Sequence, residues 1–513
     1  MLMETNSNNK RIAKNTLMLY VRMLFGMLVG LYTSRVVLEV LGVQDYGIYG
    51  VVGGIIAMMG FLNASMSIAT SRFLTYEIGK DNQELLSKIF SSAIIVHVII
   101  ALIVLVVCET LGLWFLFNKL VIPASRMTAA FWVFQLSILS AMFNITQVPY
   151  NSCIVAHEKM DVYAYVEILN VTLKLLIVYL LLIGNFDKLI LYAILMFAVS
   201  FIILMIYRTY CTRHFKECHL RLVLNKDIIV PLINFSVWNL YYEGSFAARQ
   251  QGANFLLNIF CGVIYNAASS IATTVQGILL GFSSNLIMAF RPQVIKSYAQ
   301  QNYDNMNRLI HMGTKFGLIL ILAITIPVLF EAEYLLGLWL VEVPAGSVFM
   351  VRCLLVVNVV NTASMLVVTG IQASGKIKLY SGLCGTIYIA SIFIMYVCMR
   401  LDMDYHAIYV IILITSFVVN VCYSIILKKQ VQSFEIIKFY SNAILPLALV
   451  VLIASVILSY LLQVMDNGLL QFVIFSCLAV VMILSMSLVM VFNKHERTAI
   501  LNIICDKLHL QRK

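Results

Sequence analysis

Polar side chains recur at helical intervals inside several long apolar stretches of the chain, and their types suit the binding of a polar cargo. In the stretch 162–184, four of them occur three or four positions apart: Tyr163, Glu167, Asn170 and Lys174. Residues at these intervals share one face of a helix. Charged groups inside a bilayer are costly unless they face a partner or a polar cavity. The pattern therefore predicts a helix that faces a binding cavity.

Two further stretches carry the same pattern, with Asn239, Glu243, Gln250 and Asn254 in 229–260 and Asn15, Arg22, Gly26 and Thr33 in 15–40. We expect a substrate-binding cavity lined by Arg22, Lys174, Arg249, Tyr163, Asn170, Asn239, Gln250 and Asn254. Glu167 and Glu243 are the candidates for coupling to protons or sodium. Arg35 and Glu39 lie four positions apart near the end of the first stretch, and we expect them to form a structural pair.

The elements that position these residues must be membrane helices. Of the 513 residues, 62% are hydrophobic and only 12% are charged, and the mean hydropathy is +0.94. A helix of roughly 20 apolar residues crosses a bilayer, and long continuous apolar runs exclude a barrel of alternating strands. We expect an all-α integral membrane protein of about fourteen helices. The predicted spans are 15–40, 46–71, 89–117, 127–150, 162–184, 189–208, 229–260, 263–290, 314–340, 348–371, 379–400, 405–427, 441–463 and 469–492.

The basic residues predict how the chain is oriented in the membrane. The N-terminus, the C-terminus and the loops on their side carry 26 of the 35 lysines and arginines. Because cytoplasmic loops are enriched in these residues, we expect both termini in the cytoplasm. The net charge of +11 is dispersed over loops that flank the membrane, and this argues against nucleic acid as a partner.

Similar segments recur at a nearly constant offset. IVAHEKMDVY (154–163) and IQASGKIKLY (371–380) share the pattern I-x-A-x-x-K-x-x-x-Y at an offset of 217 positions. A weaker pair contains Tyr76 and Tyr298, 222 positions apart, and Tyr46-Gly47 resembles Tyr265-Asn266 at 219. The shift corresponds to six spans, so it preserves orientation. We therefore expect two parallel six-helix lobes, 1–208 and 209–440, followed by two helices and a basic tail in 441–513, with the substrate between the lobes.

Motifs for covalent chemistry are absent from the sequence, which has no Walker A, G-x-S-x-G or H-E-x-x-H pattern. We expect a protein that is not an enzyme and has no cofactor, and a transporter driven by an ion or substrate gradient. The eleven cysteines include no C-x-x-C pair, and most lie within apolar runs. We interpret them as small apolar residues and predict no metal site.

Four segments resemble the Wzx-like polysaccharide and O-antigen flippases of the multidrug/oligosaccharidyl-lipid/polysaccharide exporter superfamily. They are RVVLEVLGVQDYGIY (35–49), AHEKMDVYAYVEI (156–168), GVIYNAASSIATTVQGI (262–278) and RPQVIKSYAQ (291–300). The resemblance covers essentially the whole chain and implies the two-lobe MATE-like fold. It implies the bacterial inner membrane as the location and an undecaprenyl-diphosphate oligosaccharide as the substrate. Membrane lipids and polysaccharide polymerase or assembly proteins are the other implied partners.

In that setting Arg22, Lys174 and Arg249 would neutralise the diphosphate, since arginine and lysine pair well with phosphate oxygens. Two alternatives remain. An ion-coupled multidrug antiporter could use the same fold, although a cationic drug would favour an acidic cavity. A scaffold of a polysaccharide assembly complex that transports nothing would not need polar faces on three helices.

Overall fold

The computed structural model describes residues 2–57, 60–118, 120, 122–183, 186–219, 226–340, 343–464, 468–494 and 496–498. Every regular element in these ranges is a helix. This agrees with the continuous apolar runs of the sequence, because a helix satisfies all of its backbone hydrogen bonds within one segment. The predicted all-α class is confirmed.

The helices follow one another along the chain with short connections. They are α1 (Leu2–Ala57), α2 (Gly60–Gly79), α3 (Gln83–Val107), η1 (Cys108–Gly112), α4 (Leu113–Asn118), η2 (Ala124–Arg126), α5 (Met127–Ala156), α6 (Met160–Leu180), α7 (Lys188–His214), η3 (Lys216–Cys218), α8 (Lys226–Cys261), α9 (Val263–Ala299), α10 (Tyr303–Phe330), α11 (Ala332–Trp339), α12 (Ser347–Ser374), α13 (Lys378–Arg400), α14 (His406–Gln430), α15 (Ile436–Phe439), η4 (Tyr440–Ile444), α16 (Leu445–Val464) and α17 (Leu469–Met490).

Eleven helical segments in the described ranges are long and apolar enough to cross a membrane. They match the predicted spans from 89–117 to 189–208 and from 263–290 to 469–492. The other three predicted spans lie in α1, α2 and α8, and in α8 polar residues such as Asn239 and Glu243 lower the mean hydropathy. The chain is therefore a multi-pass membrane protein, and the total of fourteen spans stays a prediction.

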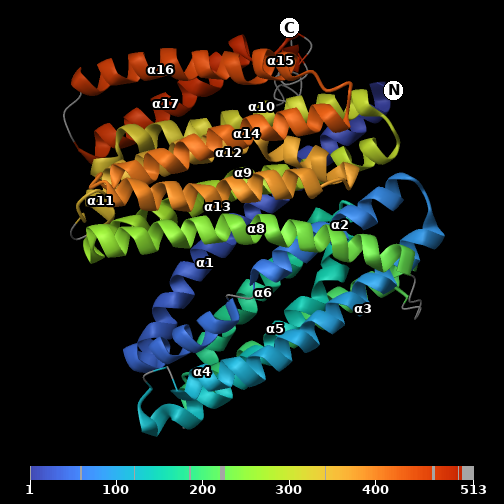
Figure 1. Ribbon diagram of the computed structural model, residues 1–513, viewed down its shortest axis with the longest axis vertical. Helices are drawn as coiled ribbons and strands as arrows, with labels where there is room; N and C mark the ends of the chain where they lie inside the picture. The colour runs from blue at the N-terminus through green and yellow to red at the C-terminus, as the bar shows by residue number, and fades with distance from the viewer. Residues whose placement is uncertain are drawn as a thin grey trace. The chain divides into compact units, whose positions relative to one another are not determined.

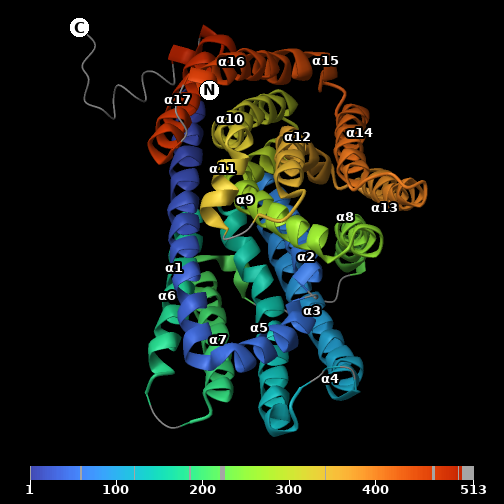
Figure 2. The same cartoon turned by 90° about the vertical axis from the view of Figure 1, so that its left-hand side faces the viewer.

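The chain forms two compact units, and unit 1 consists of Met1–Gly244 and Ile295–Gln301. Within it, α5 packs against α2, α3 and α7, while α6 packs against α1 and α7. Figure 2 shows α5, α6 and α7 running side by side. The core contains large apolar side chains that are fully buried, among them Phe90 and Phe134.

Unit 2 consists of Ser245–Val294 and Asn302–Lys513. Here α12 packs against α10 and α14, and α13 packs against α14. The last two long helices, α16 and α17, pack against each other and against α10 (Figure 1). Met350, Leu355 and Phe475 are fully buried in this core. The predicted division at residues 208 and 440 stays a prediction.

Left-handed backbone positions recur along the chain and mark an internal repeat. Gly42 (φ 77°) interrupts α1, and Gly262 (φ 91°) separates α8 from α9, 220 positions later. Glu158 (φ 59°) lies between α5 and α6, and Gly375 (φ 75°) lies between α12 and α13, 217 positions later. These two residues align within the I-x-A-x-x-K-x-x-x-Y segments.

A third pair of turns repeats in more detail. Asp81 (φ 56°) and Gln301 (φ 58°) lie 220 positions apart, and each precedes an asparagine that caps the next helix. The Asn82 side chain accepts a hydrogen bond from the Leu85 amide at 3.1 Å, and the Asn302 side chain accepts one from Asn305 at 3.1 Å. The structural offset of these segments is thus 220, not the 222 that their tyrosines suggest. Matching turns with matching caps support the predicted repeat of six helices.

Candidate functional site

In unit 1, α1 and α6 bring together residues from two of the predicted polar faces. The guanidinium carbon of Arg22 lies 4.8 Å from the ring centre of Tyr163, which is a favourable cation–π distance. The Tyr163 hydroxyl also lies within electrostatic reach of Glu167 and Asn151. Arg22, Tyr163 and Glu167 are all half-buried. A cation, a carboxylate and a phenol from the predicted set therefore share one place between two helices.

The other predicted residues of α1 and α6 lie further along the same two helices. Asn170 and Lys174 continue the same face of α6 and are half-buried. Glu39 is exposed, and the side chain of Arg35 lies outside the described residues, so the predicted Arg35–Glu39 pair stays a prediction.

The first half of α8 also belongs to unit 1 and places Asn239 against α2. Asn239 is fully buried, and its amide nitrogen lies 3.4 Å from the Ser65 hydroxyl. Ser65 in turn donates to the backbone oxygen of Ser236 at 3.0 Å. This network is built from short polar groups that join two helices, and the predicted role of Asn239 in substrate binding stays a prediction. Glu243, one turn further along α8, is half-buried.

In unit 2, the second half of α8 carries Arg249, whose side chain is 1% exposed. Its guanidinium carbon lies 4.8 Å from the ring centre of Tyr388 on α13 and 5.0 Å from that of Phe246. Asn254 accepts a hydrogen bond from the Ser269 hydroxyl at 2.8 Å. Gln250 is half-buried. The predicted substrate-binding residues thus divide between two units, and the predicted cavity stays a prediction.

The two arginines occupy corresponding helix pairs in the repeat. Arg22 lies on α1 and faces α6, whereas Arg249 lies on α8 and faces α13. The turns that repeat along the chain relate α1 to α8 and α6 to α13. Each unit therefore places an arginine from its first long helix over a tyrosine from its fifth. The sequence predicted both arginines and Tyr163 but missed Tyr388, because the buried face of α13 carries hydroxyl groups such as that of Ser391 but no charged residue.

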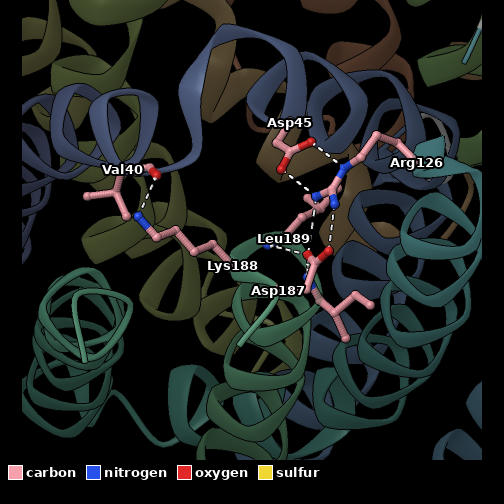
Figure 3. Close-up of polar contacts among 7 residues, drawn as sticks. Val40, Asp45, Arg126, Asp187, Lys188 and Leu189 are labelled. Atoms are coloured by element: carbon pink, nitrogen blue, oxygen red, sulfur yellow. Dashed lines mark hydrogen bonds and ion pairs between the residues drawn. The ribbon is translucent and has the colours of Figure 1, made fainter. Parts of the chain in front are cut away.

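A cluster of charged residues at one end of unit 1 was not predicted from the sequence (Figure 3). Arg126, in η2, donates from Nε to Asp45 at 2.8 Å, and its terminal nitrogens donate to Asp187 at 2.6 and 3.2 Å. A second contact joins Arg126 Nη2 to the Asp45 carboxylate. We call Asp45, Arg126 and Asp187 the Arg126 cluster. It connects the segment after the Gly42 kink to the starts of α5 and α7.

Asp187 has a second role as the N-cap of α7, because its carboxylate accepts hydrogen bonds from the amides of Leu189 and Ile190. Partial burial alone would raise the pKa of Asp187. The hydrogen bonds and charge of Arg126, together with the two amides, outweigh that effect and hold the pKa below its ordinary value. Asp187 is thus ionised at neutral pH, where it fixes both Arg126 and the start of α7.

The turn between α5 and α6 anchors the end of α9 within unit 1. Lys296 Nζ lies 2.6 Å from the carboxylate of Glu158, and the Glu158 side chain is 1% exposed. Asn15 of α1 donates to the backbone oxygen of the same glutamate at 3.3 Å. Gly79 fits closely here, because a Cβ added to it would lie 2.9 Å from the Cβ of Ala299. These contacts explain why Ile295–Gln301 groups with unit 1.

Comparison with known proteins places this fold among membrane transporters. No protein-family model and no curated protein matches the chain. Among solved structures, an outward-facing multidrug resistance MATE family transporter of the MOP superfamily superposes with a TM-score of 0.73 at 12% identity, over 83% of this chain and 97% of that chain. A MATE protein in the straight conformation gives a TM-score of 0.72 at 12% identity, over 83% and 97%.

A third similar structure is a MOP superfamily transporter from Pyrococcus furiosus. Its TM-score is 0.69 at 12% identity, over 82% of this chain and 96% of that chain, and it is described as having a binding pocket of reverse polarity that suggests a different function. The three similarities extend over nearly the full length of each known structure. The chain therefore has the MATE-like fold, as the resemblance implied.

Proposed function

We propose that this protein is a secondary transporter of the bacterial inner membrane, with both termini in the cytoplasm. In this proposal it moves an undecaprenyl-diphosphate oligosaccharide to the outer leaflet for the synthesis of a surface polysaccharide. The eleven apolar helices and the MATE-like fold support membrane transport. The identity of the cargo is a separate step of the proposal. It rests on the positive charge of Arg22, Lys174 and Arg249.

The observation that carries the cargo assignment is the pair of arginines in corresponding helices. Arg22 lies over Tyr163 in unit 1, and Arg249 lies over Tyr388 in unit 2. Burying a guanidinium between membrane helices costs free energy. Such burial is expected where the cation binds a functional partner. The planar guanidinium donates two parallel hydrogen bonds to phosphate oxygens, which suits a diphosphate better than a cationic drug.

The aromatic rings have a second use in this proposal. Each tyrosine ring lies within cation–π distance of its guanidinium and so restricts where the arginine side chain can lie. Lys174 adds a further positive charge on the same helix face as Tyr163. The polyprenyl tail needs no polar contact and can stay in the lipid, while the sugars would bind amide groups such as Gln250.

The proposal can be tested with purified protein in liposomes that contain a fluorescent undecaprenyl-diphosphate oligosaccharide. A membrane-impermeant quencher reports how fast the label changes leaflet. We expect wild-type protein to accelerate this movement, and Arg22→Ala and Arg249→Ala to slow it by about tenfold or more, the loss expected for a charge-assisted hydrogen bond. Lys174→Ala should have a smaller effect, because lysine acts as a single point charge.

Arg400→Ala is the matched control, because Arg400 is an exposed arginine at the end of α13. The Arg400→Ala protein should flip the substrate at the wild-type rate. If both Arg22→Ala and Arg249→Ala flip the substrate at the wild-type rate, with equal amounts of protein in the liposomes, the assigned phosphate contacts are wrong. If the wild-type protein does not flip the labelled substrate, the proposed cargo is wrong.

The second candidate function is an ion-coupled multidrug antiporter. One similar structure is a multidrug resistance MATE transporter, and Glu167 lies within electrostatic reach of Tyr163, where a proton or sodium ion could bind. The same liposomes distinguish the two functions. Extrusion of a cationic dye that requires a proton or sodium gradient and is abolished by Glu167→Gln, without movement of the lipid-linked sugar, would establish the antiporter instead.

A further inference from the structure

Five side chains that can bind a metal ion come together where the end of α7 and η3 lie against the end of α5. Cys153 and His157 lie four positions apart at the end of α5 and therefore share one face. Cys211 lies near the end of α7, and Glu217 and Cys218 lie in η3. We call these residues the Cys153 cluster. The proposed transport function uses none of them.

Three ligand atoms of the cluster lie close enough together to share one ion, and a fourth lies beside one of them. One ligand atom each from Cys153, His157 and Glu217 lies within 4.8 Å of the other two. The sulfur of Cys218 is 3.6 Å from that of Cys153, and a Glu217 oxygen is also 3.6 Å from the Cys153 sulfur. Zinc binds sulfur at about 2.3 Å with tetrahedral geometry, which puts two sulfur ligands about 3.8 Å apart.

Two adjustments are needed before all four residues could hold one ion: the His157–Glu217 contact must open, and the Cys218 sulfur must move toward the group formed by the other three ligand atoms. His157 Nε2 and the Glu217 oxygen are 2.5 Å apart, and an ion between them would hold them about 3.3 Å apart. The His157 ring is stacked on Phe215 at 4.2 Å, so its plane is already fixed. The remaining adjustments fall on the Glu217 carboxylate and the Cys218 side chain, both of which lie in η3.

Burial distinguishes this cluster from ordinary surface residues. Cys153 is 0%, Cys218 1% and Glu217 3% exposed, whereas acidic side chains are seldom buried without a strong partner. A buried carboxylate and two buried thiols favour a cation that accepts soft sulfur ligands. The Cys211 thiol donates to the backbone oxygen of Tyr150 at 3.4 Å and stays outside the ligand set.

We propose that Cys153, His157, Glu217 and Cys218 bind one zinc ion at the predicted cytoplasmic end of unit 1. Binding displaces the two thiol protons and places three anionic ligands and one neutral imidazole around the ion. The ion holds η3 against the end of α5, and so fixes the chain where it leaves α7. This site departs from the interpretation of all the cysteines as small apolar residues.

The test uses the full chain, purified in detergent with a reductant and without a chelator from cells grown with added zinc. Elemental analysis should find about one zinc per chain in the wild type and at least about tenfold less in the Cys153→Ser/Cys218→Ser variant. Cys384→Ser/Cys422→Ser is the matched control, because it removes two thiols of unit 2. It should keep the zinc of the wild type.

A second measurement needs only the wild type and so does not depend on the folding of a variant. Cobalt added to metal-free protein should give the visible bands of a tetrahedral site and the ultraviolet bands of a cobalt–thiolate bond, and zinc should remove both. Wild-type protein that carries no more zinc than the double variant, or cobalt spectra without thiolate bands, would overturn the proposal. A reducible Cys153–Cys218 disulfide in the wild type would overturn it as well.

Discussion

In the first repeat, the segment after Gly42 is joined to the starts of α5 and α7 by ion pairs, whereas the segment after Gly262 is packed on aromatic rings. Asp45 and Tyr265 each lie three positions after the glycine, so the structural offset of 220 pairs Tyr265 with Asp45 and not with Tyr46. Arg126 and Gly346 each directly precede a long helix. The rings of Tyr265 and Tyr405 are 4.6 Å apart, and both approach Gly346. We call Tyr265, Gly346 and Tyr405 the Tyr265 cluster.

The third position of each cluster also corresponds, because Asp187 precedes α7 and Tyr405 precedes α14. Three equivalent positions thus meet in both repeats, with charges in one and with rings and a glycine in the other. The repeat has preserved which segments touch, while the chemistry of the contact has changed. An ionic contact responds to pH and salt, whereas an aromatic contact responds mainly to shape.

The largest effect is expected from Gly346→Ala, which tests the shape of the Tyr265 cluster. Gly346 has φ +84°, and a Cβ there would lie 3.1 Å from Tyr405 Cε2 and 3.3 Å from Tyr265 Cδ1. The backbone conformation and the crowding together should cost about 2–4 kcal/mol. Thermal unfolding in detergent should show a clearly lower Tm. Gly337→Ala is the control, since no atom lies within 4 Å of its added Cβ, and an equal Tm for both variants would contradict the packing described.

A smaller effect is expected from Arg126→Ala, which removes the cation of the Arg126 cluster. The change leaves Asp45 and Asp187 without their shared partner, and we expect a loss of about 1–2 kcal/mol, because water still reaches these side chains. Arg126→Lys should recover part of the Tm. The loss should shrink when Asp45 is also changed to Asn. A full loss in the double variant would mean that charge is not what holds this cluster together.

The smallest effect is a dependence on pH that only the Arg126 cluster should show. The folded-state pKa of Asp187 is below its unfolded value, so its contribution to stability is present above about pH 4 and disappears as the pH falls through the folded-state pKa. Asp187→Asn should therefore have a lower Tm than the wild type at pH 7. The difference should close below about pH 4. A difference that stays constant down to pH 3 would contradict the ionic role of Asp187.

Much of this fold could be predicted because bilayer thickness dictates the length of each apolar helix. The helical spacing of polar residues also identified Arg22 and Tyr163, although it could not measure their separation. The Arg126 cluster could not be found in this way. Arg126 lies 81 positions from Asp45 and 61 from Asp187, and each residue taken alone looks like a solvated charge near a loop.

The Cys153 cluster was missed for a similar reason. Cys153 and Cys218 are 65 positions apart, and no local spacing predicts that they meet. One local signal was present, since Cys153 and His157 lie at the four-residue interval that two metal ligands on a helix use. That interval is common in helices, so it becomes informative only once η3 is seen to lie beside it.

The paired turns at Asp81–Asn82 and Gln301–Asn302 have a practical consequence for protein engineering. Both turns pass through the same left-handed step and begin the next helix with the same asparagine cap. A segment cut at one turn and joined at the other would keep its backbone direction and its first hydrogen bond. These turns are therefore natural crossover points for a hybrid with two copies of one half, which would resemble the ancestor expected before a gene duplicated and its halves diverged.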